Sequence, residues 1–165
     1  MSDGGNPETG SNGASNEVGI QALTQFIKDL SFENPGAMMN LASPPETQFN
    51  IDPQVRQLDL QHYEVELRVR ISAKSPDDKP VFLLELVYAG VFMVHGSPPE
   101  DFLQQILLID SPQLLFPFVR QIVSNLIQGG GLPPLLLPMI NFAALYRARA
   151  AEGQQQRITP QTPDA

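Results

Sequence analysis

The stretch Val81-Phe-Leu-Leu-Glu-Leu-Val-Tyr-Ala-Gly-Val-Phe-Met-Val94 decides the fold of this chain. It is rich in β-branched, aromatic and aliphatic residues, which suit the pleated surface of a β-strand. It carries one charge and is shorter than the about 20 apolar residues that a transmembrane helix needs. We therefore predict a β-strand whose side chains alternate between two faces. These faces are Phe82, Leu84, Leu86, Tyr88, Gly90, Phe92 and Val94 on one side and Leu83, Glu85, Val87, Ala89, Val91 and Met93 on the other.

The preceding segment, residues 62–71, alternates strictly between apolar and charged side chains. This pattern is typical of an antiparallel strand with one buried and one wet face, the wet face carrying Glu64, Glu66, Arg68 and Arg70. Residues 75–80 carry turn-forming side chains, so the two strands should form a hairpin. The second strand is apolar on both faces. We expect the chain's own helices to cover one face and an interaction partner to use the other.

Composition narrows the possible functions. The 165 residues suffice for one domain with a core, and the net charge of −8 with only 10 Lys+Arg argues against nucleic-acid binding. The absence of cysteine excludes disulfides and thiolate metal sites and fits a reducing compartment. The first residues lack the pattern of a secretory signal. We expect a cytoplasmic protein without direct membrane insertion.

The chain divides into three parts. Residues 1–16 are mostly small and polar and are predicted to be a disordered tail, because they cannot bury enough apolar surface to order themselves. Residues 17–151 should form the single folded domain. The polar residues 152–165 are predicted to be a second disordered tail.

Two further segments are predicted in the first half of the domain. Residues 18–34 fit a helical stripe and a strand alternation equally well, so periodicity leaves both open. Residues 47–52 alternate as a short strand, and residues 53–61 should connect it to the hairpin.

The second half of the domain is predicted to be helical. Pro98 and Pro99, followed by acidic residues, predict a helix over residues 100–109. We expect residues 110–112 to end it and a longer helix to run over 113–128 until three glycines stop it. Residues 132–138 contain three prolines and should be extended. Asn141 should cap a last helix over residues 142–152.

No catalytic constellation is visible. His62 and His95 are the only histidines, and neither has a neighbour at metal-ligand spacing. The glycines at 129–131 end a helix and are not followed by lysine, so they do not form a phosphate loop. We expect no enzyme activity, no metal and no cofactor.

Two observations leave a choice between structure and binding. Glu85 lies among apolar residues and is either solvated or a contact for a basic partner; the two interpretations have equal weight. The aromatic residues Phe32, Phe49, Phe116 and Phe142 are ordinarily core residues. Beside the methionine and proline loops they could instead line an adaptable apolar groove.

Five ordered motifs resemble those of SecB, the bacterial protein-export chaperone family. They are Phe26-Ile-Lys-Asp-Leu-Ser-Phe-Glu-Asn-Pro35, Tyr63-Glu-Val-Glu-Leu-Arg-Val69, Phe82-Leu-Leu-Glu-Leu-Val-Tyr-Ala-Gly-Val-Phe92, Leu115-Phe-Pro-Phe-Val-Arg120 and Pro134-Leu-Leu-Leu-Pro-Met-Ile-Asn-Phe-Ala-Ala-Leu-Tyr146. The resemblance covers residues 18–150. It implies an α+β fold, a four-stranded antiparallel sheet with helices packed on one face, in which residues 18–33 are the first strand.

The resemblance also implies site residues. Asp29, Glu33, Leu83 and Glu85 are similar to the family's docking positions for the export ATPase SecA. Leu84, Leu86 and Tyr88 match positions linked to assembly of a homotetramer, a dimer of dimers. Candidates for the client groove are Phe32, Leu41, Phe49, Phe116 and Phe142.

The function that the resemblance implies is that of an ATP-independent holdase. Such a chaperone binds unfolded secretory precursor proteins, keeps them competent for export and delivers them to SecA. Two alternatives stay open: a SecB-like chaperone dedicated to one client, such as an antitoxin, and a small carrier of hydrophobic ligands.

Overall fold

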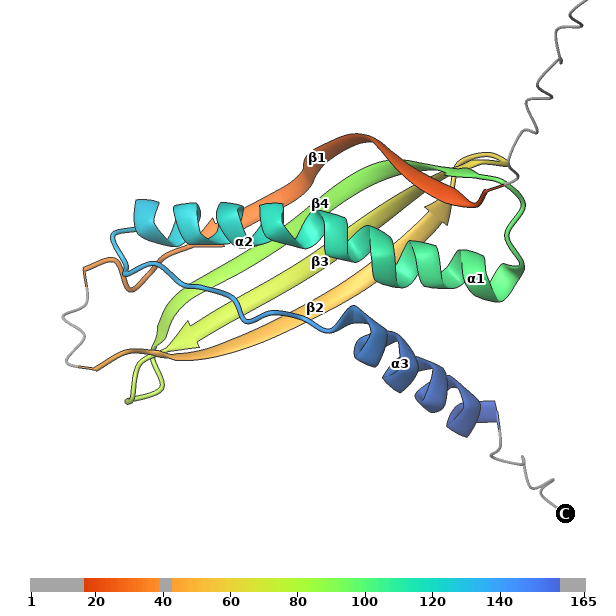
Figure 1. The fold of residues 1–165 in the computed structure, drawn as a ribbon. Helices are drawn as coiled ribbons and strands as arrows, with labels where there is room; N and C mark the ends of the chain where they lie inside the picture. Colours follow the sequence, from red (N-terminus) through yellow and green to blue (C-terminus); the bar gives the residue numbers. More distant parts are fainter. Residues whose placement is uncertain (1–16, 39–42, 158–165) are drawn as a thin grey trace, which may run out of the picture.

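The computed structural model describes residues 17–38 and 43–157. It has the predicted α+β architecture, with one four-stranded antiparallel sheet and helices on one face (Figure 1). The strand order is β1-β4-β3-β2, so β1 and β2 are the edges. The strands are β1 (Gly19–Glu33), β2 (Glu46–Gln57), β3 (His62–Lys74) and β4 (Pro80–His95).

The hairpin of β3 and β4 is the centre of the sheet, as predicted. Leu67 is opposite Tyr88 and Val69 is opposite Leu86. Directly paired residues share a face. The face predicted to be covered is buried on both strands: Val65, Leu67, Ile71, Leu84, Leu86 and Phe92 are at most 1% exposed.

The ambiguous N-terminal segment is a strand, β1, in agreement with the family resemblance. Its pairing with β4 has two irregularities, between Ala22 and Thr24 and between Ile27 and Asp29. Each is a β-bulge, in which one extra residue opposes a continuous partner. The two extra residues break the alternation of a strand and produce spacings of three and four, which explains the misleading helical stripe.

The strand β2 is longer than predicted and includes Pro53, which was expected to begin a connection. Proline lacks a backbone N–H and is therefore confined to edge strands, where this group needs no ladder partner. Because β2 is an edge strand, Pro53 is compatible with it.

The predicted separation of two helices at residues 110–112 is wrong. The short helix α1 (Glu100–Gln105) continues through a π-helical turn, η1 (Ile106–Asp110), into α2 (Ser111–Gly129). The proline at position 112 lacks an N–H and would crowd the preceding turn of a regular α-helix. The wider π turn relieves this crowding, and the Ser111 hydroxyl donates a hydrogen bond to the Ile106 carbonyl at 2.9 Å.

This continuous helix, Glu100–Gly129, covers one face of the sheet (Figure 1). It is long and apolar enough to cross a membrane, but a core helix of a water-soluble protein meets the same criteria. Its apolar side is buried through Leu115, Val119, Val123 and Ile127, each at most 1% exposed. The helix ends at Gly129, with Gly130 as its C-cap, as the three glycines predicted.

The C-terminal helix α3 (Phe142–Arg157) extends past its predicted end at Glu152. Asn141 caps it as expected, because its side-chain oxygen accepts a 2.9 Å hydrogen bond from the Ala144 N–H. Residues 132–141 before it have no regular secondary structure.

The expected wet face of β3 is only partly wet. Arg68 and Arg70 are exposed, but Glu64 and Glu66 are 6% and 7% exposed. Basic side chains from the neighbouring strands cover these carboxylates: Lys28 contacts both, and Arg56 contacts Glu64. Alternation alone could not reveal this, since the covering side chains come from other strands.

We expect Gly90→Ala to destabilise the protein. A Cβ at this position would lie 2.8 Å from a ring carbon of Phe92 and 2.9 Å from a methyl of Leu115, and both side chains are fully buried. Overpacking of this kind lowers the free energy of unfolding by about 1–3 kcal/mol. Urea denaturation measures this change. Gly129→Ala is the matched control, because its Cβ meets nothing within 4 Å. Equal unfolding midpoints for the two variants would contradict the predicted close approach of α2.

Candidate functional site

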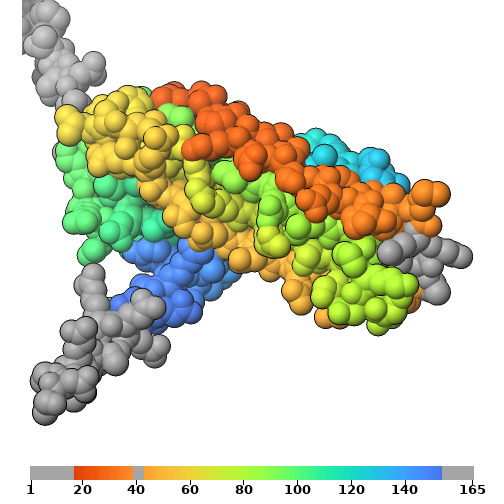
Figure 2. Space-filling view, turned by 180° about the vertical axis from the view of Figure 1, so that it is seen from behind, coloured from red at the N-terminus to blue at the C-terminus, as the bar shows by residue number. Residues whose placement is uncertain are grey.

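The four residues predicted to contact SecA lie together on the face of the sheet that the helices leave bare. Glu33 is opposite Leu83, Asp29 is opposite Val87, and Glu85 lies between these pairs on β4. We call Asp29, Glu33, Leu83 and Glu85 the carboxylate face. Figure 2 views the molecule from this side, where the strands lie in front of the helices. The surface combines an apolar centre with three carboxylates.

Basic residues also reach this surface. The Arg70 guanidinium forms an ion pair with Glu85, and the two side chains are 59% and 46% exposed. An exposed pair of this kind contributes about 0–1 kcal/mol and exchanges readily with another charged partner. A shallow depression of about 310 Å³ lies beside the pair, lined among others by Asp29, Asp52 and Arg68.

A partly buried charge network borders the carboxylate face. The Lys28 ammonium donates hydrogen bonds to Glu64, at 2.6 Å, and to Glu66. These bonds raise the pKa of Lys28 above its ordinary value. Burial acts to raise the pKa of Glu66, but hydrogen bonds from Lys28 and Arg68 outweigh it, so the pKa is lowered. Both shifts favour the charged forms of Lys28 and Glu66.

A larger depression, of about 540 Å³, opens between residues 43–47, the end of α2 and the proline-rich segment after it. No charged residue is among the described residues that line it. Phe82 forms part of its wall and lies against Phe32, with ring centroids 6.1 Å apart. The other lining residues are Ser43, Pro44, Pro45, Thr47, Ile127, Gly131, Leu132, Pro133, Pro134 and Leu135.

A second apolar depression, of about 240 Å³, lies between α2 and the start of α3. Phe116 and Phe142 form its floor, with ring centroids 5.7 Å apart, and Met139 lies at its rim. Both phenylalanines are nearly fully buried, at 4% and 1% exposure. They are therefore core residues of which only the edges border the depression.

The four groove candidates within the described residues are not gathered in one cavity. Phe32 packs against Phe82 behind the wall of the larger depression but does not line it, whereas Phe116 and Phe142 border the smaller one. Phe49 is half-buried on β2 and packs against the core. Leu41 lies outside the described residues. Phe82 and residues 131–135 line the larger depression but were not among the predicted groove residues, although the run of prolines and leucines there indicated an unusual apolar segment.

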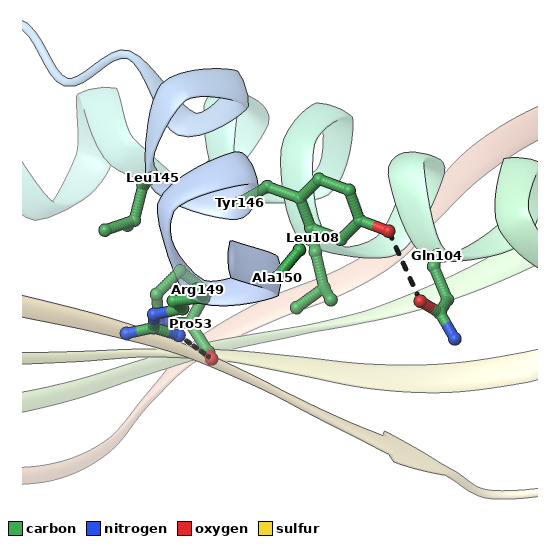
Figure 3. A pocket seen from close by; sticks show the side chains of 7 residues that line it. All are labelled: Pro53, Gln104, Leu108, Leu145, Tyr146, Arg149 and Ala150. Atoms are coloured by element: carbon green, nitrogen blue, oxygen red, sulfur yellow. Dashed lines mark hydrogen bonds between the residues drawn. The ribbon is translucent and has the colours of Figure 1, made fainter. Parts of the chain in front are cut away.

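The helix α3 is attached to β2 beside these depressions (Figure 3). Arg149 forms an ion pair with Asp52 and donates a 3.2 Å hydrogen bond to the Pro53 carbonyl. The Tyr146 hydroxyl contacts the Gln104 side chain at 3.3 Å. Leu108 and Leu145 complete a small pocket of about 220 Å³ under the helix. Polar contacts thus fix the position of α3 over a loosely filled interface.

The three residues predicted to lie at an oligomer interface point into the protomer. Leu84 and Leu86 are 0% and 1% exposed, so neither side chain is available for a direct contact with a second copy. Tyr88 is 7% exposed and stacks on Phe118 of α2, with ring centroids 6.2 Å apart. The strand β1, which pairs with the strand of Tyr88, and the long helix, which carries Phe118, expose large apolar side chains that we call the exposed apolar strip. Its members are Leu23, Ile27 and Leu30 of β1 and Phe102, Leu114 and Phe118 of the long helix, each 37–47% exposed.

Catalytic groups do not gather in the described part of the chain. His62 contacts the Asp59 carboxylate at 2.8 Å near the start of β3. No group of three potential metal ligands occurs among the described residues. The described residues thus offer two kinds of surface, the carboxylate face and the apolar depressions, rather than a cluster of reactive groups.

Comparisons with known proteins identify the class. The family model described as "Preprotein translocase subunit SecB" matches residues 13–153. A protein-export protein SecB of Paramagnetospirillum magneticum is 46% identical, over 84% of this chain and 90% of its own. One of Paracoccus denitrificans is 42% identical, over 88% of this chain and 85% of its own. The chain belongs to the SecB family of protein-export chaperones and, as predicted, is not an enzyme.

A solved structure supports the fold. The SecB-like chaperone of Mycobacterium tuberculosis, in complex with a ChAD peptide from the HigA1 antitoxin, superposes with a TM-score of 0.63. The match covers 73% of this chain and 90% of that one at 19% identity. At this identity the similarity concerns the fold alone.

We expect Phe142→Ala to reduce stability strongly. Removing a buried phenylalanine that packs edge-on against Phe116 leaves a cavity and lowers the free energy of unfolding by about 3–5 kcal/mol. Chemical denaturation measures this loss. Met139→Ala is the control, because Met139 borders the same depression but is 79% exposed, and its truncation should change stability by less than about 0.5 kcal/mol. An unchanged midpoint for Phe142→Ala would remove this residue from the core.

Proposed function

We propose that this protein is an ATP-independent holdase that binds unfolded secretory precursors, keeps them competent for export and delivers them to SecA. The observation that carries the proposal is the separation of two kinds of surface. Apolar depressions lie beside the helices, and the carboxylate face lies on the opposite side of the sheet. Client and SecA would therefore bind without competing for the same residues.

The larger depression suits apolar segments of an unfolded chain. The described residues of its lining are uncharged and rich in proline, whose fixed backbone loses little entropy when a ligand binds. Each Å² of apolar client surface buried there contributes about 25 cal/mol. Folded proteins hide such segments, so this term favours unfolded clients.

Several binding surfaces on one oligomer would strengthen these weak contacts. We propose a homotetramer, a dimer of dimers, assembled through the exposed apolar strip of β1 and the long helix. Six large apolar side chains are exposed on the single protomer. Exposed apolar side chains in such number usually mark an interface with another molecule. Occupation of several depressions by one client would raise the overall affinity through effective concentration.

The carboxylate face is the proposed SecA contact. Its three carboxylates and the net charge of −8 favour a basic surface on the partner. Glu85 would exchange its exposed pair with Arg70 for a contact with SecA. This exchange takes place in the cytoplasm, where precursors meet SecA before export.

A chaperone dedicated to one client is the second candidate, because the structurally similar M. tuberculosis chaperone was solved with an antitoxin peptide. A carrier of small hydrophobic ligands is less well supported, since the depressions found in the described residues are open rather than enclosed.

Light scattering tests the holdase function. We expect the mass of four protomers for the protein alone and an increased mass after addition of a reduced, unfolded precursor. The same precursor in its folded state is the control and should not bind. A monomer that ignores unfolded precursors would contradict the proposal, and binding of an antitoxin but of no precursor would favour the dedicated chaperone.

We expect Glu85→Lys to weaken SecA binding at least about tenfold and to leave client binding unchanged. The substitution replaces a carboxylate that would attract a basic surface of SecA with an ammonium group that would repel it. Titration of labelled protein with SecA measures the affinity. Glu46→Lys makes the same change of charge at an exposed position on β2, away from the carboxylate face. If both variants bind SecA equally well, the assignment of this surface is wrong.

A further inference from the structure

At Lys28, the regular alternation of side chains between the two faces of β1 is interrupted. Before this residue, Phe26 is opposite Ala89 and Ile27 is opposite Tyr88; after it, Asp29 is opposite Val87. Lys28 is thus the extra residue of a β-bulge. Without an extra residue, regular alternation would turn Asp29 toward the helices, because a shift of one position exchanges the two faces of a strand.

The apolar pattern requires an extra residue here but does not determine which one it is. Ile27 and Leu30 are three positions apart, and both lie on the helix side, opposite Tyr88 and Leu86. One of the two residues between them must therefore be unpaired. Hydrophobic burial would be satisfied equally if Lys28 were paired with Val87 and Asp29 were the extra residue.

The contacts of Lys28 distinguish these alternatives. Its side chain crosses β4 and binds Glu64 and Glu66 on β3. Ala89 is the residue of β4 that pairs with both Phe26 and Glu66, and its methyl group leaves room for this crossing. Each carboxylate is at most 10% exposed at its side chain, so losing the ammonium would leave partly uncompensated buried charge.

We infer that Lys28 is a positioning residue for the carboxylate face: its bonds to Glu64 and Glu66 select Lys28 as the bulged residue and thereby hold Asp29 opposite Val87, on the surface that contains Glu85. This inference rests on the proposed binding of SecA to that surface. Lys28 acts through Asp29 and needs no contact with SecA itself.

The sign of the effect of Lys28→Met on SecA binding tests the inference. Removing a positive charge from this protein should, by Coulomb attraction alone, tighten the binding of a basic partner. We expect instead that affinity falls about tenfold, because Asp29 is no longer held in place. Lys79→Met is the matched control: it removes the same charge from an exposed hairpin residue and should not weaken binding. Equal affinities of the two variants would overturn the inference.

A double-mutant cycle tests whether the effect passes through Asp29. In an Asp29→Asn background, Lys28→Met should cause little further loss, because the positioned carboxylate is already absent. A full tenfold loss in that background would overturn the positioning role. Glu85→Lys separates this failure from a failure of the proposed function: if it too leaves SecA binding intact, the surface itself has been wrongly assigned.

Deletion of Lys28 provides a test that remains valid if Lys28→Met folds poorly. Without the extra residue, Ile27 and Asp29 become neighbours and pair with Tyr88 and Val87 in regular alternation. Glu64 retains Arg56 and Glu66 retains Arg68 as partners. We expect a smaller loss of SecA affinity than for Lys28→Met, because Asp29 keeps its place opposite Val87 although the ammonium is lost. A loss as large as that of Lys28→Met would overturn the inference, since it would mean that SecA binding needs the Lys28 side chain even when Asp29 is in place.

Discussion

The packing of one long helix on one face of the sheet is the constraint on which this structure depends. Leu115, Val119, Val123 and Ile127 of α2 are buried where they meet the apolar side chains of β3 and β4. Burying a large aliphatic side chain contributes about 1.5–3 kcal/mol, so a single row of such residues provides much of the stability of a domain of this size. Because no second helical layer exists among the described residues, the opposite face must be compatible with water by other means.

Charged side chains make the face opposite the helices compatible with water. Glu64 and Glu66 are buried beneath Lys28, Arg56 and Arg68, and Glu85 pairs with Arg70. Ion pairs of this kind add little net stability, since desolvation offsets much of their attraction. The pairs of Lys28 with Glu64 and Glu66 link β1 to β3 across β4, on a face that no helix covers.

The sequence correctly predicted the parts of the fold in which apolar residues recur at one regular spacing. The faces of β3 and β4 followed from alternation, and the glycines after α2 and Asn141 before α3 marked helix ends correctly. Prediction failed where a single residue is inserted into a regular element. The bulges obscured β1, and the π turn allowed a helix to continue through a proline that was expected to end it.

Of the candidate site, the carboxylate face was predicted from the sequence better than the lining of the depressions. Two motifs of the family resemblance supplied Asp29 and Glu33 on one strand and Leu83 and Glu85 on another, and the strand pairing brings the four residues together. Phe82 was assigned to the core side of its strand, which is correct, but its exposure to the larger depression depends on loops that converge from distant parts of the chain. The burial of Leu84 and Leu86 likewise depends on α2, so a motif match could not distinguish a packing role from a direct contact between copies.

The π turn at Ile106–Asp110 has a consequence for comparing this chain with others. It adds one residue to a helix that otherwise advances about 100° per residue. A homologue without that residue would keep α2 seated on the sheet but would rotate the preceding turns of α1 by this angle, moving Phe102 away from the side that carries Leu114 and Phe118. Alignments of such chains should therefore place a gap inside the helix. The number of residues in this one turn would then indicate which side of α1 faces the sheet.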